Sequence, residues 1–248
     1  MKPFGWKLAF ALSASTIAAV TSAQSTCARM GVNQLQNGRY NFQMNEHHSS
    51  LKECASIDDL GFTITTANFN NATNGAPAAY TSIYRGCHWG ACTASSPFPI
   101  QESKLASATA GVKLKQPSGY NDDASYDIWF NQAPKTSGQP NGAEVMIWLN
   151  HQGKIQPFGS RVATAEIDGA QYEVWTGNQS SWNIVSYVAS QPVNEAKNLD
   201  LLPFFADAVS RGSLQPSWWL IDVEFGFEIW TGGKGLAMSD FSANAAAR

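Results

Sequence analysis

The clearest pattern of hydrophobic and polar positions lies between Trp218 and Trp230, where every second residue is apolar. The apolar positions are Trp219, Ile221, Val223, Phe225, Phe227 and Ile229. Because successive side chains of a β-strand point to opposite faces, this alternation predicts a strand with one face in the core. The opposite face carries Asp222, Glu224 and Glu228 and no cation. Carboxylates placed between two tryptophans indicate a cleft rather than an ordinary solvated face.

Two further segments, residues 144–150 and 125–130, repeat this design. In the first, the apolar face consists of Val145, Ile147 and Leu149, and the other face of Glu144, Met146, Trp148 and Asn150. In the second, Asp127 and Trp129 share the face opposite Tyr126, Ile128 and Phe130. Both segments are therefore predicted strands that present an acid and a tryptophan on one side.

The acidic faces of these three predicted strands can form one surface if the strands lie side by side. Glu144 and Glu228 would then confront each other, with Asp127 behind them. Large aromatic side chains are more often part of a core than a ligand platform. A buried core position is therefore an open alternative for Met146, Trp148 and Trp129.

The chain between residues 60 and 190 reads as short strands separated by turn dipeptides. These dipeptides are Asn74-Gly75, Asn141-Gly142, Asp168-Gly169 and Gly177-Asn178. They supply the positive φ that tight hairpins need. Residues 162–167 and 171–175 flank Asp168-Gly169 and are predicted to form a hairpin.

One segment predicts a helix, with Asp200 as its N-cap, Pro203 in the first turn and Gly212 after its end. Its apolar face consists of Leu201, Leu202, Phe204, Phe205, Ala208 and Val209. No repeat, linker or charge block divides the chain after its N-terminal segment. Many strands with one helix predict a single all-β domain, a sandwich or a barrel.

The N-terminal segment has the pattern of a signal peptide. Lys2 and Lys7 precede the apolar residues 8–20, and Thr21-Ser22-Ala23 resembles a cleavage site. The apolar run is short for a membrane span, and no later segment reaches about 18 consecutive apolar residues. We therefore expect residues 1–23 to be removed and residues 24–248 to be a soluble, secreted domain that does not enter a membrane.

Export changes what the four cysteines indicate. In an oxidising compartment an even number of cysteines favours disulfides, and four allow three pairings. Pairing nearest neighbours, Cys27 with Cys54 and Cys87 with Cys92, ties down the N-terminal region and closes a short loop. A metal site at Cys87, His88 and Cys92 is the alternative, but no second Cys/His pair lies at a suitable spacing. We expect disulfides and no metal or other cofactor.

Composition excludes two classes of protein. The chain of 248 residues has only 14% charged residues, a formal net charge of −3, and 12% aromatic residues. Intrinsic disorder needs few aromatics and high net charge, so the chain is expected to fold. It has no basic excess that could replace phosphate counterions, so a nucleic-acid partner is not expected.

The predicted carboxylate cleft suits glycoside hydrolysis. In that chemistry one carboxylic acid protonates the leaving oxygen, and a second carboxylate attacks the anomeric carbon or activates water. Apolar neighbours and a second carboxylate can raise the pKa of the acid enough for it to keep its proton. The chain contains no G-x-S-x-G elbow and no Gly-rich phosphate loop of the Walker or Rossmann type. A two-carboxylate hydrolase is thus favoured over a serine hydrolase or a nucleotide-binding enzyme.

The three acidic segments resemble the active-site strands of glycoside hydrolase family 12. They read Ser125-Tyr126-Asp127-Ile128-Trp129, Glu144-Val145-Met146-Ile147-Trp148-Leu149 and Gly226-Phe227-Glu228. Further matches are Asn74-Gly75-Ala76-Pro77, Gly86-Cys87-His88, Ile155-Gln156-Pro157 and Tyr172-Glu173-Val174-Trp175. The resemblance runs from about Cys27 to Phe241, and the cysteine pattern is closer to the bacterial branch of the family.

The resemblance implies a β-jelly-roll sandwich whose concave face forms an open cleft, and endo-acting, retaining hydrolysis of β-1,4-glucans. Glu144 matches the nucleophile, Glu228 the general acid/base, and Asp127 the acid that supports the nucleophile. A retaining pair of carboxyl groups is expected about 5 to 5.5 Å apart. The positions expected to contact substrate are Asn45, His47, Trp129, Met146, Trp148 and Trp230.

Three departures from the family pattern concern the cleft. The family's first cleft strand usually reads Asn-Asn-x-Trp, whereas this chain has Met44-Asn45-Glu46-His47. The missing tryptophan leaves substrate preference open, because His47 is a poorer stacking surface. Glu224 is an unusual charge, which either raises the pKa of Glu228 or lies exposed at the cleft rim, and we expect the rim. Gly153-Lys154 replaces a Gly-Pro pair on a nearby loop.

Two hypotheses follow. The first is a secreted, monomeric endo-β-1,4-glucanase acting on cellulose, mixed-linkage glucan or xyloglucan. The second is a jelly-roll glycan-binding protein with weak catalysis. Both acids and Asp127 favour the enzyme, and only the loss of the tryptophan at position 47 favours the binding protein.

Overall fold

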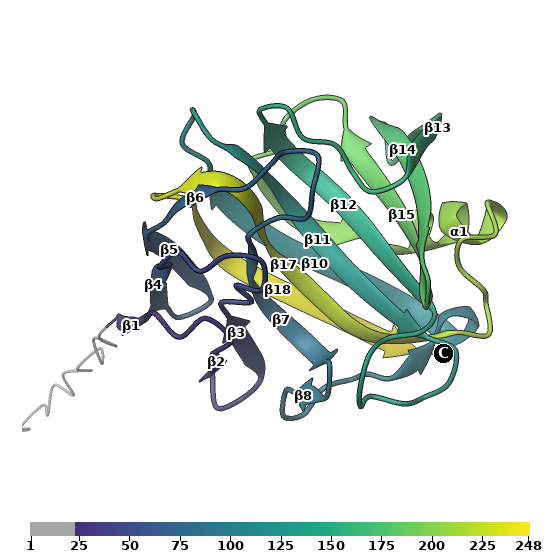
Figure 1. The fold of residues 1–248 in the computed structure, drawn as a ribbon. Helices are drawn as coiled ribbons and strands as arrows, with labels where there is room; N and C mark the ends of the chain where they lie inside the picture. Colours follow the sequence, from purple (N-terminus) through teal and green to yellow (C-terminus); the bar gives the residue numbers. More distant parts are fainter. Residues whose placement is uncertain (1–22) are drawn as a thin grey trace, which may run out of the picture.

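A computed structural model describes residues 23–248, so the predicted signal peptide, except for Ala23, lies outside the described residues. The described chain forms two packed β-sheets and one α-helix (Figure 1). No helix in this part of the chain is long and apolar enough to cross a membrane. The arrangement is the β-jelly-roll sandwich that was expected.

The smaller sheet has six strands. In spatial order they are β1 (Gln24–Thr26), β4 (Cys54–Asp58), β5 (Gly61–Thr66), β18 (Ala237–Ala247), β10 (Leu105–Lys115) and β16 (Glu195–Asp200). All of its pairings are antiparallel. A short 3₁₀ turn, η1 (Glu102–Lys104), precedes β10.

The larger sheet carries the acidic strands. Its main path is β13 (Ser160–Ile167), β14 (Ala170–Gln179), β15 (Trp182–Ala189), β12 (Ala143–Gln152), β11 (Asn121–Asn131), β17 (Trp219–Gly233), β7 (Ala79–His88), β3 (Tyr40–Gln43) and β2 (Val32–Leu35). Three short strands complete it, of which β6 (Asn68–Asn70) and β9 (Ile100–Gln101) pair with β17, and β8 (Ala91–Cys92) pairs with β7. Figure 1 shows β12, β11, β17 and β7 running side by side. Within this sheet, β12 and β15 pair in parallel.

The core lies between the two sheets and confirms the predicted alternation. Phe225, Phe227 and Ile229 of β17 are fully buried in it, together with residues of β10 and β18 such as Val112 and Phe241. The prediction was wrong before Asp222, because Leu220 is in this core and Trp218 packs against it, whereas Ile221 and Trp219 are not part of it. The register of β17 against β11 shifts at this point, and the bulge turns the side chain of Leu220 to the core face.

The predicted helix is α1 (Leu202–Ser210). The N-cap is Leu201 and not Asp200 as predicted, although the Asp200 carboxylate accepts a hydrogen bond from the N–H of Leu202 at 3.0 Å; Pro203 lies in the first turn. Gly212 follows the helix with a φ of +74°, as a terminating glycine does. Phe204 and Phe205 are fully buried and pack the helix against the larger sheet.

The turn predictions were right at one hairpin and wrong at another position. Strands β13 and β14 form the predicted hairpin around Asp168 and Gly169, which have φ of +49° and +76°. Gly177-Asn178, however, lies inside β14, and the chain turns after Gln179. Gly177 is needed for close packing instead, because a Cβ there would lie 2.6 Å from the Phe158 ring. Asn74-Gly75 and Asn141-Gly142 lie in longer loops before β7 and β12.

Both nearest-neighbour disulfides form, Cys27–Cys54 and Cys87–Cys92. The first joins the segment after β1 to the start of β4. The second bridges β7 and β8, where the two cysteines face each other in the strand register. These sulfur atoms are therefore not available for the alternative metal site of Cys87, His88 and Cys92.

Candidate active site

The three acidic strands are neighbours in the larger sheet, in the order β12, β11, β17. In the register, Glu144 lies opposite Trp129, and Asp127 lies between Met146 on one side and Glu224 on the other. The sheet therefore brings the acidic faces onto one common surface. This confirms the adjacency that the sequence could only suggest.

Two hollows of about 600 Å³ and about 610 Å³ lie along this surface, and Glu144 and Glu228 line both of them. The first hollow is bordered by residues 73–77, residues 156–159 and Trp230. The second is lined by side chains that include Asn45, His47, Trp89, Asp127, Trp129 and Trp182. The two carboxyl groups thus stand where both halves of one cleft meet.

Glu144 has only 8% of its surface exposed and accepts one hydrogen bond. The indole Nε1–H of Trp182 donates to its Oε2 at 2.9 Å. Burial raises the pKa of Glu144 to about 7, while this hydrogen bond acts in the opposite direction. Trp182 enters from β15, which the sequence did not connect with the acidic strands.

Glu228 faces a second carboxyl group, that of Asp123. Strand β11 pairs Asp122 with Ile229 and Ser125 with Gly226 without a shift between them, which sets Asp123 opposite Glu228. Cross-strand neighbours have Cβ atoms about 4.5 to 5.5 Å apart. Burial raises the pKa of Glu228 well above its usual range, and the charge of Asp123 and their mutual hydrogen bond raise it further.

The hydrogen bond of this pair acts in opposite directions on the two pKa values, raising that of Glu228 and lowering that of Asp123. Asp123 is fully buried. Burial raises the pKa of Asp123 too, but the hydrogen bond from Glu228 lowers it. Asp123 was missed in the sequence, although it has the same strand parity as Asp127 and so had to share its face.

Asp127 is buried beside both candidate catalytic acids, with 5% of its surface exposed. The hydroxyl of Ser125 donates to its Oδ1 at 3.3 Å. Burial raises the pKa of Asp127 well above its usual value, and the charges of Glu144 and Glu228 raise it further. A protonated Asp127 is a hydrogen-bond donor beside Glu144, which suits the supporting role expected from the resemblance.

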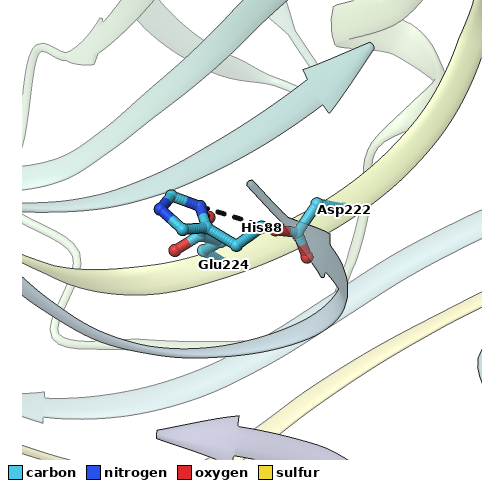
Figure 2. Close-up of side chains that lie close together, drawn as sticks. All are labelled: His88, Asp222 and Glu224. Atoms are coloured by element: carbon cyan, nitrogen blue, oxygen red, sulfur yellow. Dashed lines mark ion pairs between the residues drawn. The ribbon is translucent and has the colours of Figure 1, made fainter. Parts of the chain in front are cut away.

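Glu224 is not at the cleft rim, so that expectation was wrong. It is fully buried, and its Oε2 accepts hydrogen bonds from Gln43 Nε2 at 2.8 Å and from Ser82 Oγ at 3.0 Å. Its Oε1 forms an ion pair with Nδ1 of His88 (Figure 2). Nor does Glu224 figure among the neighbours that raise the pKa of Glu228. Strands β3 and β7 supply the polar partners that make burial of this charge tolerable.

One group of side chains in the described part of the chain could hold a metal ion. It consists of His88, Asp222 and Glu224. Their donor atoms lie within 4.8 Å of one another, and His88 Nδ1 is 3.8 Å from Oδ2 of Asp222. Burial and the neighbouring Glu224 raise the pKa of Asp222 well above its usual value. Both carboxyl groups already face the His88 ring, so the contacts within the cluster account for it as an ion-pair network.

Most of the expected substrate contacts lie in the cleft. Asn45, His47 and Trp129 line the second hollow, and Met146 and Trp230 line the first. Trp148 is a correction, since it is 1% exposed and lines neither hollow. It packs with Ile155 and Val188 beneath the cleft floor, so the core alternative holds for this residue.

The profile of glycosyl hydrolase family 12 matches residues 36–246. The chain belongs to this family. The match covers both sheets apart from their edge strands β1 and β2, and it includes the helix and every acid of the cleft described above.

Three relatives illustrate the range of similarity. The structure titled endoglucanase cel12A from Rhodothermus marinus superposes with a TM-score of 0.87 at 38% identity, covering 91% of this chain and 100% of that one. A probable cellulase, Cel12b, from Mycobacterium tuberculosis is 37% identical over 145 residues, 58% of this chain and 95% of its own. A Phytophthora nicotianae protein named inactive glycoside hydrolase XLP1 is 24% identical over 98% of this chain and 99% of its own.

Proposed function

We propose that this protein is a secreted, retaining endo-β-1,4-glucanase. One observation carries the proposal: Glu144 and Glu228 meet at the junction of two hollows with neighbours that set their protonation apart. Glu144 has an N–H donor and a pKa of about 7, and Glu228 has a pKa held well above its usual range. Carboxyl groups whose surroundings separate their pKa values mark the two roles of a glycosidase.

The proposed reaction proceeds in two displacements at the anomeric carbon. Glu228 donates its proton to the glycosidic oxygen while the Glu144 carboxylate attacks the anomeric carbon, which breaks the glycosidic bond and forms a glycosyl ester. Glu228, now ionised, then takes a proton from water as that water attacks the same carbon and releases Glu144. Two inversions leave the configuration retained. Asp127 supports Glu144 from beside it, because a protonated Asp127 adds no second negative charge next to the nucleophile.

Substrate and location are the finer parts of the proposal. The cleft continues on both sides of the acids, which suits a polymer bound across the cleavage point and cut internally. Two disulfides suit an oxidising compartment, in keeping with export directed by residues 1–23. We propose cellulose or a related β-glucan as the substrate, and a monomer as the active species.

The test is release of reducing ends by the purified protein from carboxymethylcellulose, barley β-glucan and xyloglucan, with Glu144→Gln as the blank. We expect release that disappears in the variant, and the ranking of the three polymers gives the preference. Proton NMR of the first product would show the β-anomer if the mechanism is retaining. The mass of the secreted chain tests cleavage after Ala23.

A glycan-binding protein with weak catalysis is the second candidate. It is favoured by His47, which stands where the family usually has tryptophan. The similarity to the Phytophthora nicotianae protein named inactive glycoside hydrolase XLP1 also favours it. Binding of barley β-glucan without release of reducing ends, by a protein whose circular dichroism shows a folded β-sheet protein, would support this candidate instead.

A further inference from the structure

The hairpin of β7 and β8 presents a tryptophan in a conformation that tryptophan seldom adopts. Cys87 pairs with Cys92 and His88 with Ala91, which leaves Trp89 and Gly90 as a two-residue loop. Their φ values are +43° and +92°, so both residues are left-handed, as in a type I′ turn. Asn-Gly and Gly-Gly are the residues that favour this turn, and a bulky side chain at its first position is strained.

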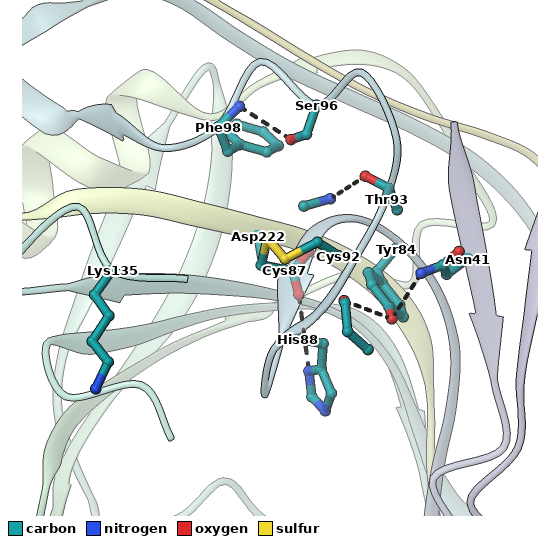
Figure 3. The surroundings of a disulfide bond; sticks show 12 residues. Asn41, Tyr84, Cys87, His88, Cys92, Thr93, Ser96, Phe98, Lys135 and Asp222 are labelled. Atoms are coloured by element: carbon teal, nitrogen blue, oxygen red, sulfur yellow. Dashed lines mark hydrogen bonds and ion pairs between the residues drawn. A yellow bond between two sulfur atoms is a disulfide. The ribbon is translucent and has the colours of Figure 1, made fainter. Parts of the chain in front are cut away.

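The strain is tolerated because the hairpin is fixed on every side (Figure 3). The Cys87–Cys92 disulfide closes it, and the Tyr84 hydroxyl donates to the carbonyl of Ala91 at 3.0 Å. Beyond the disulfide, the Thr93 N–H donates to the carbonyl of Gly86 at 2.8 Å. Strained backbone that its surroundings over-determine is typical of ligand-binding positions.

The Trp89 side chain faces the cleft. It is 43% exposed, more than any other tryptophan among residues 23–248, and it lines the hollow that Asp127, Glu144 and Glu228 share. Its ring meets the edge of Trp129, with centroids 5.1 Å apart and an interplanar angle of 80°. The exposed part of the indole opens into this hollow, where a ligand can meet it.

The His88 ring also packs against Trp89. The two ring centroids are 4.3 Å apart, and the His88 ring is held by its ion pair with the buried Glu224. The buried acids Asp222 and Glu224 therefore have a structural consequence in the cleft, because they orient the residue on which the tryptophan packs (Figure 2). A rigid and partly exposed aromatic side chain contributes contact area at a low entropic cost.

We propose that Trp89 is a sugar-binding platform of the second hollow, stacking its indole face on a pyranose ring of the glucan. This inference deepens the proposed function and relies on it for the class of ligand, a β-1,4-linked glucan. In this protein the platform comes from the β7–β8 hairpin, while His47 lines the same hollow with a smaller ring. We expect this platform to hold a sugar unit beyond those that lie at the catalytic acids, so it should strengthen binding of long chains and hardly affect short ones.

The variant Trp89→Asn separates binding from folding, because asparagine is favoured in the left-handed turn but offers no ring. We expect its melting temperature to equal or exceed that of the parent. In the Glu144→Gln background, which prevents hydrolysis, we expect calorimetry to show cellohexaose binding weakened by about tenfold. Trp89→Phe keeps a ring at the same turn and should retain most of the affinity.

Three results would overturn the platform. The first is cellohexaose bound equally by Trp89→Asn and its parent. The second is an equal loss for cellobiose and cellohexaose, which would mean that the hairpin shapes the whole cleft. The third is a lower melting temperature in both variants together with weak binding by Trp89→Phe, which would make Trp89 a folding residue. Because these are binding measurements, they remain decisive even if the parent protein hydrolyses nothing.

Discussion

Glu144 and Glu228 lie at one junction in the cleft, yet their polar neighbours are opposite in kind. An indole N–H from β15 faces Glu144, whereas a second carboxyl group from β11 faces Glu228. Burial is the largest cause of the raised pKa in both acids, so burial alone cannot separate their roles. The separation comes from single neighbours, Trp182 and Asp123, which favour the ionised form of one acid and the protonated form of the other.

The strongest test of this contrast compares Glu144→Gln with Glu228→Gln. Each change should lower kcat on barley β-glucan by about a thousandfold or more, because each removes a group that forms or breaks bonds. The two variants should differ in activity on an aryl cellobioside with a dinitrophenolate leaving group. That leaving group needs no proton, so Glu228→Gln should regain much of the first step, and Glu144→Gln should not.

Thermal unfolding of both variants serves as the control, since a loss of activity is informative only if the fold is intact. The assignment of roles would be reversed if Glu144→Gln, rather than Glu228→Gln, recovered on the activated substrate. Neither acid would be catalytic if both variants kept normal turnover on the polymer.

Asp127 gives the next largest expected effect. Its raised pKa makes it a protonated donor next to Glu144. Asp127→Ala removes that donor and should lower kcat by about a hundredfold, while Asp127→Asn keeps an N–H and should lose only about tenfold. Steady-state kinetics on barley β-glucan would measure both. Equal losses in the two variants would show that the charge of Asp127, not its proton, supports the nucleophile.

The local pattern was enough to predict the acidic strands but not all of their surroundings. Alternation in β17 placed Phe225 and Phe227 in the core and Glu228 in the cleft, because strand parity is a local property. The helix and the Asp168-Gly169 hairpin were predictable for the same reason, since caps and turns depend on neighbouring residues. The turn predicted at Gly177-Asn178 was wrong, because Gly177 lies within a strand and packs closely against Phe158.

How deeply each side chain on the cleft face is buried could not be predicted from its odd or even position in the strand. Trp148 and Met146 share one face of β12, yet residues from elsewhere in the chain, such as Ile155 and Val188, pack on Trp148 and leave Met146 at the hollow. Glu224 is buried because Gln43 and His88, distant in sequence, arrive on β3 and β7. Trp182 reaches Glu144 through the parallel pairing of β15 with β12, a long-range contact that no local motif marks.

Asp123→Asn should change the pH dependence rather than abolish the reaction. The Asp123 charge and hydrogen bond raise the pKa of Glu228, so the substitution should lower that pKa. Glu228 must be protonated to act as an acid, and its activity is lost as pH rises through its pKa. The basic limb of kcat/KM should therefore move to lower pH.

The matched control is Asp122→Asn, the same change at the adjacent residue. Asp122 accepts a hydrogen bond from Gln152 at 2.9 Å and is not among the groups that shift the pKa of Glu228. Its variant should keep the basic limb of the parent. If the limb moved to higher pH in Asp123→Asn, the proton would reside on Asp123 in the free protein, and the two residues would exchange roles.

Trp182→Phe tests the other side of the contrast and should have the smallest effect. It removes the N–H that donates to Glu144 at 2.9 Å and lowers its pKa, so the pKa should rise from about 7. The nucleophile acts only when ionised, so the acidic limb of kcat/KM should move to higher pH. We expect a move of about half a unit, because water can replace part of the lost hydrogen bond.

Trp175→Phe is the control, since its indole N–H has no hydrogen-bond partner within the described chain. A profile that narrows from the acidic side here and from the basic side in Asp123→Asn would show that single neighbours assign the two roles. An unchanged acidic limb would leave burial as the sole determinant for Glu144.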